Sequence, residues 1–322
     1  MIPGLHGRDQ KPQFLLMRLG TMESLIYHFP VSGVETYLFL PPLVMFCIST
    51  LVSMGGVTGA FILIPFQISV LGYTGPGVSA TNFVYNIIAI PLGVYKHIRD
   101  GKLSGPLFAV IMIGTLPGVL LGYYVRVHYL PDPAHFKIFV GFVLLYLGAR
   151  TFFGAIGDFR DPATGNRKPA KGARLHGGTV GARQSTIHFG KETYTFPTPY
   201  VFIMSLIVGV IGGAYGIGGG AIMAPFCIAV LRLPAYVVAG AALSSTWVTS
   251  VVGALFYAFI PMGTGVATQP DWLLGGLFGL GGMLGVYTGA HLQKYVPGSY
   301  IKAVLSVAIL GVAGKYLSPL LY

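Results

Sequence analysis

The sequence predicts an all-α fold, a polytopic transmembrane helical bundle made of two inverted repeats. The chain of 322 residues is 54% hydrophobic and only 9% charged, whereas soluble proteins are about 25% charged. Continuous apolar stretches long enough to span a bilayer, which takes about 20 residues, recur along it. These stretches do not alternate with polar residues, so they indicate helices and not a membrane β-barrel. The two halves of the chain also resemble each other.

The apolar segments divide the chain into four parts. Residues 1–36 are a mixed segment, in which Phe14–Phe29 is expected to form an amphipathic helix on the membrane surface. Transmembrane repeat 1 is expected over 37–156, a basic cytoplasmic linker over 157–198, and transmembrane repeat 2 over 199–322. The expected helical segments are 37–54, 60–72, 76–98, 105–126 and 135–156, then 199–217, 219–231, 236–260, 272–292 and 299–320.

The second segment of each set is too short to span a bilayer, and it follows a cluster of glycines. The clusters are Gly55–Gly59 in the first half and Gly216–Gly220 in the second, and Pro65 and Pro225 follow closely. Glycine runs and internal prolines weaken helices. The sequence therefore predicts broken or half-length helices after both clusters.

The linker is the one part of the chain that has the composition of a soluble segment. Its last residues alternate between polar and apolar in two runs, Ser185–Phe189 and Glu192–Phe196, around Gly190-Lys191. This pattern is typical of a β-hairpin. A partly disordered connector is the alternative interpretation.

A shift of 160 positions aligns the two halves around the glycine clusters. It matches Gly59 with Gly219, and Pro65-Phe66 with Pro225-Phe226. A shift of 167 then aligns Gly114, Gly118 and Gly122 with Gly281, Gly285 and Gly289. The order of these matches indicates an internal duplication.

The charges of the loops predict that the two repeats have opposite orientations. Lys96, Arg99 and Lys102 follow the third segment of repeat 1, whereas the corresponding loop of repeat 2, Pro261–Asp271, has no Lys or Arg. Because basic loops stay in the cytoplasm, corresponding loops lie on opposite sides, as in the inverted repeats of secondary transporters. The basic residues that this orientation places outside argue against it: Arg8, Lys11, Arg18, Arg126 and Lys137.

These features together resemble the TauE/SafE sulfite exporter family. The residues that carry the resemblance are Gly55–Gly59, Pro65-Phe66, Ser79-Ala80-Thr81-Asn82, Arg99-Asp100-Gly101-Lys102, Gly212-Gly213, Gly216–Gly220, Pro225-Phe226 and Ala239-Gly240-Ala241. The resemblance extends from Leu38 to Leu317 except for the linker. It implies export of sulfur-containing anions such as sulfite or organosulfonates. The long linker, and Thr58 and Ala60 where repeat 2 has Gly218 and Gly220, depart from a minimal, symmetric member.

The distribution of acidic residues favours an anion as the transported species. None of the nine Asp and Glu residues lies inside an apolar segment, so the buried carboxylates of the usual proton relays are missing. Half-helices that start after Gly59 and Gly219 would offer free N–H groups and the positive ends of their dipoles. The candidate substrate-binding residues are Gly56, Gly59, Gln67, Thr81, Asn82, Asn86, Gly216, Gly218, Gly219, Gly220, Ser244, Ser245 and Thr246. For the polar residues, helix packing is the alternative role.

The sequence thus predicts a multi-pass transporter of the cell inner (plasma) membrane that exports small sulfur-containing anions. A channel-like or uptake pathway for another small anion is the alternative, and a membrane-embedded enzyme is less favoured because no catalytic motif occurs. No cofactor or metal ion is expected. Nucleic acid is not expected either, since the net charge of +11 is explained by basic loops beside the membrane spans. The expected partners are the lipid bilayer and the anion, and a homodimer stays open.

Overall fold

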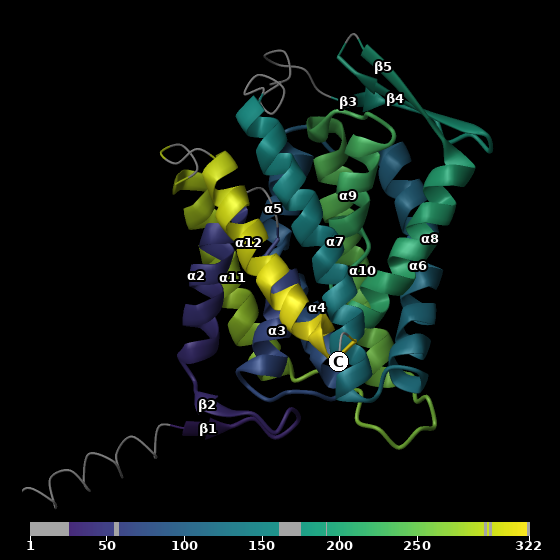
Figure 1. Ribbon diagram of the computed structural model, residues 1–322. Coiled ribbons are helices and arrows are strands. Elements are labelled where there is room, and N and C mark those ends of the chain that lie inside the picture. The colour runs from purple at the N-terminus through teal and green to yellow at the C-terminus, as the bar shows by residue number, and fades with distance from the viewer. Residues whose placement is uncertain are drawn as a thin grey trace, which may run out of the picture.

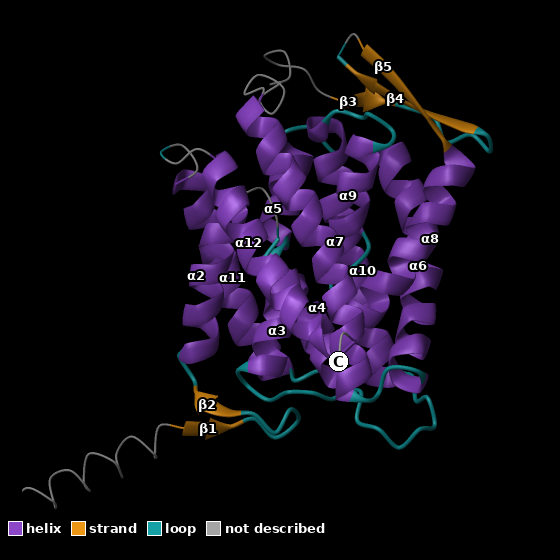
Figure 2. Cartoon of the chain, viewed as in Figure 1, coloured by secondary structure: helices purple, strands orange, loops and turns teal. Residues whose placement is uncertain are grey.

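The computed structural model describes residues 26–54, 58–160, 175–190, 192–292, 295 and 298–320, and it forms a bundle of helices (Figure 1). Six of the described helices are long and apolar enough to cross a membrane, and a bent pair of helices makes a seventh candidate. The short strands lie beyond the two ends of the bundle (Figure 2). The all-α, multi-pass architecture expected from the sequence is confirmed.

Each expected apolar segment of the described chain forms helix. In the first half the helices are α2 Leu40–Met54, α3 Ala60–Ser69, α4 Gly77–Ala89, α5 Pro91–Arg99, α6 Gly105–His128 and α7 Pro133–Arg160. In the second half they are α8 Thr198–Tyr215, α9 Gly220–Ala229, α10 Ala235–Phe259, α11 Trp272–Leu292 and α12 Gly298–Leu317, which a short 3-10 turn, Ser318–Leu320, follows.

The helices α3 and α9 have half the length of a membrane span. Each contains 10 residues and is therefore about 15 Å long at 1.5 Å per residue, against a hydrocarbon core of about 30 Å. Each begins directly after its glycine cluster, Gly59 and Gly219 being the residues that precede their first turns. The predicted half-length helices are therefore present.

The third segment of the first half differs from the single helix expected over 76–98. It divides into α4 and α5, which are bent by 41° at a break at Ile90, directly before Pro91, the first residue of α5. Proline removes a backbone donor and its ring collides with the preceding turn. The corresponding helix of the second half, α10, has Val251 at the equivalent position and continues without a break for 25 residues.

The aligned glycines of α6 and α11 are the places where the two halves pack most closely. A β carbon at Gly118 would lie 2.5 Å from the Leu206 carbonyl oxygen of α8, and one at Gly285 would lie 2.5 Å from the Phe46 carbonyl oxygen of α2. Glycines spaced four residues apart let helix backbones approach in this way within membranes. Helix α6 of the first half thus packs against α8, the first helix of the second half, and α11 packs against α2, the first helix of the first half.

The two halves run in opposite directions. Helix α2 starts at the end of the bundle where β1 and β2 lie, whereas α8 starts at the other end, next to β5 (Figure 1). The last helices of the two halves, α7 and α12, pack against each other. This reciprocal arrangement is that of an inverted repeat.

The segment before α2 is not the amphipathic helix expected over Phe14–Phe29, as far as it is described. Residues Ile26–His28 form strand β1, which pairs in antiparallel fashion with β2, Glu35–Tyr37. Gly33 between them has φ 68°, a conformation that glycine adopts without strain. Residues 14–25 of the expected helix lie outside the described part of the chain.

The linker contributes a three-stranded antiparallel sheet of β3 Leu175–Gly177, β4 Gln184–Phe189 and β5 Glu192–Pro197. Strands β4 and β5 coincide with the two alternating runs of the sequence and pair around Gly190. Strand β3 was not expected, because three residues with a register shift against β4 give little sequence signal. The Leu175 amide donates to the Gly101 carbonyl, so the sheet covers the end of the bundle where α6 begins.

We expect the linker sheet and the loop after α10 to be on opposite sides of the membrane. Cysteines would replace Thr179 and Thr264, both exposed, in a chain without its native Cys47 and Cys227. A membrane-impermeant thiol reagent should label only the Thr264 site on intact cells, and both sites after permeabilisation. Labelling of the Thr179 site on intact cells would refute this orientation.

Candidate functional site at the helix breaks

The break between α8 and α9 is a turn that only glycine can form at its first position. Gly216 has φ 91°, and its N–H and that of Ile217 both donate to the Gly212 carbonyl, at 2.8 and 3.2 Å. This is the usual left-handed end of a helix. A β carbon on Gly216 would also collide with the Ser79 carbonyl of α4.

Two asparagines of α4 satisfy the carbonyls that the break leaves without helical partners. Asn82 Nδ2 donates to the Gly216 oxygen at 3.0 Å, and Asn86 Nδ2 donates to the Ile217 oxygen at 3.3 Å. Residues four apart share one face of a helix, so α4 presents one amide to each carbonyl. Carbonyls within a membrane need such partners.

Side chains also bind the carbonyls of the last turn of α8, two and three residues before Gly216. The Tyr257 hydroxyl donates to the Gly213 oxygen at 3.0 Å, and the Ser79 hydroxyl donates to the Ala214 oxygen at 2.8 Å. The carbonyls that a helix end leaves free are thus bound by side chains of α4 and α10.

The two half-helices meet through this network. Asn82 Nδ2 also donates to the Ala60 oxygen at 3.0 Å, and the Tyr215 hydroxyl donates to the Phe61 oxygen at 2.6 Å. Ala60 and Phe61 form the start of α3, and Tyr215 is the last residue of α8. Asn82 therefore bridges the breaks of the two repeats with a single amide.

The start of α9 is tightly enclosed. A β carbon on Gly220 would collide with the Ala242 oxygen of α10, and one on Gly219 with Cγ2 of Thr115 on α6. One on Gly218, which has φ 74°, would lie 3.0 Å from Cγ2 of Thr246. The glycines therefore bring the first N–H groups of α9, which have no partners within the helix, close to α6 and α10.

The start of α3 has different neighbours. A β carbon on Gly59 would lie 2.9 Å from the Ser49 hydroxyl and 3.0 Å from the Tyr85 hydroxyl, and these two hydroxyls are 3.1 Å apart. Gly56, the other predicted residue of this cluster, lies outside the described residues. The residues directly before the two half-helices, Gly59 and Gly219, thus have similar backbone angles and different side-chain surroundings.

Several predicted residues are buried with polar atoms that have no partner among the described residues. These atoms are Asn82 Oδ1, Asn86 Oδ1, the hydroxyl oxygens of Ser244 and Ser245, and both amide atoms of Gln67. Buried polar atoms without partners are costly, so they mark places where a ligand or water would be stabilised.

Two predicted residues have hydrogen-bond partners outside the network of Asn82 and Asn86, although Thr246 itself lies beside Gly218 and Gly220 at the start of α9. The Thr81 oxygen accepts a hydrogen bond from the Asp271 amide at 3.0 Å, and Thr246 donates to Ala242 within its own helix at 3.0 Å. Thr81 therefore ties α4 to the loop before α11, and the structure does not bring it to the helix breaks.

The network also contains residues that were not among the candidate substrate-binding residues, namely Ser79, Tyr215 and Tyr257. A tyrosine near the end of a helix has no sequence pattern that would show which backbone carbonyl its hydroxyl binds. Arg126 was noted only as a loop charge, yet its side chain is fully buried.

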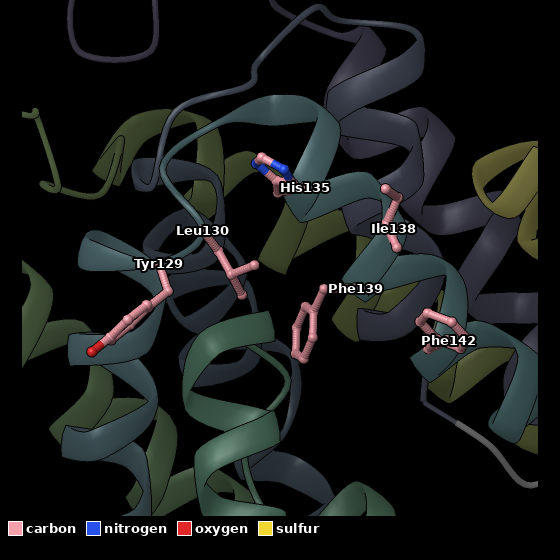
Figure 3. Close-up of a pocket in the computed structure, with 6 residues that line it drawn as sticks. All are labelled: Tyr129, Leu130, His135, Ile138, Phe139 and Phe142. Carbon is pink, nitrogen blue, oxygen red and sulfur yellow. The ribbon is translucent and has the colours of Figure 1, made fainter. Parts of the chain in front are cut away.

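The best-defined hollows of the surface lie elsewhere. One, of about 400 Å³, lies between the end of α6 and the start of α7 (Figure 3), lined by Tyr129, Leu130, His135, Ile138, Phe139 and Phe142. The other, of about 270 Å³, lies between α6, α8 and the loop before β4. Neither includes a predicted site residue, and Asn82 and Asn86 are fully buried, so the breaks are enclosed in this conformation. The described residues include no cluster of three or more His, Cys, Asp or Glu that could hold a metal ion.

The comparisons with known proteins agree with this architecture. The family model described as "Sulfite exporter TauE/SafE" matches residues 42–316, which cover both sets of helices and both glycine breaks. The searches of curated proteins and of solved structures found no match. The family is one of membrane transporters of sulfur-containing anions. Because its model matches most of the chain, this protein belongs to the TauE/SafE sulfite exporter family.

Proposed function

We propose that the protein exports sulfite or organosulfonates across the inner (plasma) membrane, and that the anion binds at the helix breaks near the midplane. The observation that supports this most directly is that Asn82 joins the start of α3 to the break before α9, through hydrogen bonds to the Ala60 and Gly216 carbonyls. Each half-helix directs its free N–H groups and the positive end of its dipole toward its break. An oxyanion bound there would be stabilised without a buried cation.

The polar atoms around the breaks favour an anion that also carries a hydrogen-bond donor. The hydroxyls of Ser244 and Ser245 have no hydrogen-bond partner within the described part of the chain and can donate to an oxyanion. Because both amide groups direct Nδ2 toward carbonyls, Asn82 and Asn86 are left with free oxygens, which only accept. Hydrogensulfite and zwitterionic aminosulfonates offer both an oxyanion and a donor.

The carboxylates of the described helices have structural partners. Asp158, near the end of α7, lies 2.8 Å from the Lys302 ammonium of α12. Asp271 accepts from the Leu274 amide at 3.0 Å, as an N-cap of α11, and from the Ser32 hydroxyl at 2.7 Å. Neither is free to carry a proton through the bundle, which supports transport without a proton relay.

The membrane potential alone can drive such export. Outward movement of an anion from a negative interior gains about 2.3 kcal/mol per charge for each 100 mV. Hydrogensulfite, with one charge, would gain about 2.3 kcal/mol, and sulfite, with two charges, roughly 4.6 kcal/mol. At about 1.4 kcal/mol per factor of ten, these gains correspond to outward gradients of roughly fortyfold and on the order of a thousandfold. We therefore propose electrogenic transport without an obligatory sodium or proton partner.

We expect the purified protein in liposomes to carry sulfite along an imposed potassium–valinomycin potential, with sodium and pH equal on both sides. Taurine, a zwitterion without net charge at neutral pH, should move down its own concentration gradient and should not respond to the potential. Sulfate is an oxyanion without a hydrogen-bond donor at neutral pH, so we expect it to move more slowly than sulfite. Efflux that ignores the potential and follows a sodium or proton gradient would contradict electrogenic transport.

The same assay separates the alternative functions. Flux that saturates with anion concentration indicates a carrier, whereas flux that stays linear indicates a channel-like pathway. Preferred accumulation from the outside would indicate uptake. Absence of flux for every sulfur-containing anion would contradict the proposed function.

A further inference from the structure

Arg126, in the last turn of α6, is a fully buried arginine in an apolar part of the bundle. It lies at the end of α6 that is opposite the linker sheet (Figure 1). Under the proposed topology, this is the outer end of the pathway. Arginine is rarely fully buried unless it is paired, so its surroundings decide what the charge does.

No described carboxylate neutralises Arg126. The ion pairs among the described residues are His28–Glu35, Lys102–Asp100, His135–Asp132 and Lys302–Asp158. The guanidinium instead lies over the Phe136 ring, with Cζ 3.7 Å from the ring centroid. A ring face attracts a cation but does not cancel its charge, and an uncompensated buried charge is costly.

The hydrogen bonds of Arg126 also leave donors unused. One terminal nitrogen donates to the Leu130 carbonyl and the other to the Thr74 carbonyl at 3.5 Å, while Nε has no partner among the residues that the structure describes. A guanidinium has five N–H donors in a planar fork, so two bonds to neutral carbonyls hold the group in place without satisfying it. The free donors have the geometry that binds an oxyanion.

The guanidinium is connected to the helix breaks by a short series of contacts. Tyr123 lies three residues before Arg126 on the same face of α6, and its ring centroid is 4.3 Å from that of Tyr257. Tyr257 in turn binds the last turn of α8 through Gly213. Away from the breaks, Arg126 donates to the Leu130 carbonyl, and Leu130 lines the surface hollow shown in Figure 3.

We infer that Arg126 binds the transported oxyanion between the helix breaks and the outer surface, and that the anion is the missing counter-charge of this arginine. The inference rests on the proposed function and deepens it. The bonds to Thr74 and Leu130 position the guanidinium, and its remaining N–H groups bind substrate oxygens. A divalent oxyanion, which gains most from the charge, should depend on Arg126 more than a zwitterionic sulfonate.

Sulfite and taurine flux into liposomes would be measured for wild type, Arg126→Gln, Arg126→Lys and Lys315→Gln. Lys315 is an exposed cation near the end of α12, on the same side of the bundle, so its variant controls for the loss of one positive charge there. Arg126→Gln should raise the KM for sulfite at least about tenfold, the loss of a charge-assisted hydrogen bond. Arg126→Lys should lie between it and wild type, and Lys315→Gln should match wild type.

A binding measurement separates a ligand from a purely structural role. Sulfite should raise the unfolding temperature of the wild-type protein in detergent, and this shift should shrink in Arg126→Gln. A folded Arg126→Gln protein with wild-type KM and wild-type shift would overturn the inference. Failure of both Arg126 variants to fold even with saturating sulfite would assign Arg126 a structural role and overturn it too. If the wild-type protein itself moves no anion, the proposed function has failed instead.

Discussion

Replacement of Asn82 by aspartate is expected to abolish transport. The amide of Asn82 donates to the carbonyls of Ala60 and Gly216, one from each break. An ionised aspartate donates to neither and adds a negative charge where the anion is proposed to bind, and a protonated one has a single donor for two carbonyls. A buried carbonyl left without a partner costs about 1–3 kcal/mol. Anion flux in liposomes, normalised to folded protein, is the measurement.

Two further variants show which property of Asn82 matters. Asn82→Leu also removes both donors but adds no charge, so equal loss in the two variants would assign the effect to the bridge between the breaks. Ser306→Ala is the matched control, because the Ser306 hydroxyl is buried and donates only within α12, to Ala303. Wild-type flux in a folded Asn82→Asp protein would refute the role of the bridge.

Gly219→Ala is expected to lower transport by roughly tenfold to a hundredfold, the equivalent of an overpacking cost of about 1–3 kcal/mol. The backbone of Gly219 is ordinary, with φ −69° and ψ −34°, so alanine causes no dihedral strain. The damage comes from the new β carbon, which would collide with Cγ2 of Thr115 on α6. The bulkier Gly219→Val should lose transport completely.

A second substitution should restore Gly219→Ala. Thr115→Ser removes the methyl group that the new β carbon meets and keeps the hydroxyl that donates to the Ile111 carbonyl at 2.7 Å. The double variant Gly219→Ala/Thr115→Ser should therefore regain most of the flux. As a control, Gly314→Ala should have wild-type flux, because a β carbon added at Gly314 would meet open space. No rescue in a folded double variant would show that the start of α9 is sensitive for another reason.

The helical framework was predictable because it depends on local composition and on the thickness of a bilayer. Apolar stretches of known length must become helices in lipid, and the glycine clusters before Ala60 and Gly220 mark where helices break. The bend at Pro91 was predictable in principle from the proline, but proline alone does not distinguish a kink from a helix end. Strand β1 was missed because its partner, Glu35–Tyr37, is polar at its first position and only three residues long.

The candidate site was predictable as a set of residue types and only partly as a set of contacts. Buried amides in lipid need partners, and this argument singled out Asn82 and Asn86 as candidate substrate-binding residues; in the structure their Nδ2 atoms bind backbone carbonyls at the breaks. The same argument grouped Thr81 with them, although adjacent residues on a helix face different directions, and Thr81 binds Asp271. Arg126 was assigned to a loop because a basic residue near a helix end usually reaches the surface.

By itself, the sequence determined a duplicated, all-helical membrane protein of opposed halves, with half-length helices after glycine clusters and no acid within its apolar segments. These properties follow from composition, spacing and loop charge, which do not depend on which residues are in contact in the folded bundle. The tertiary structure decided that Asn82 joins the two breaks and that Arg126 is buried without a carboxylate partner among the described residues. Asn82 and Gly216 lie 134 positions apart in the chain. Such contacts depend on which helix faces come together, and helix packing fixes those faces only when the whole bundle is assembled.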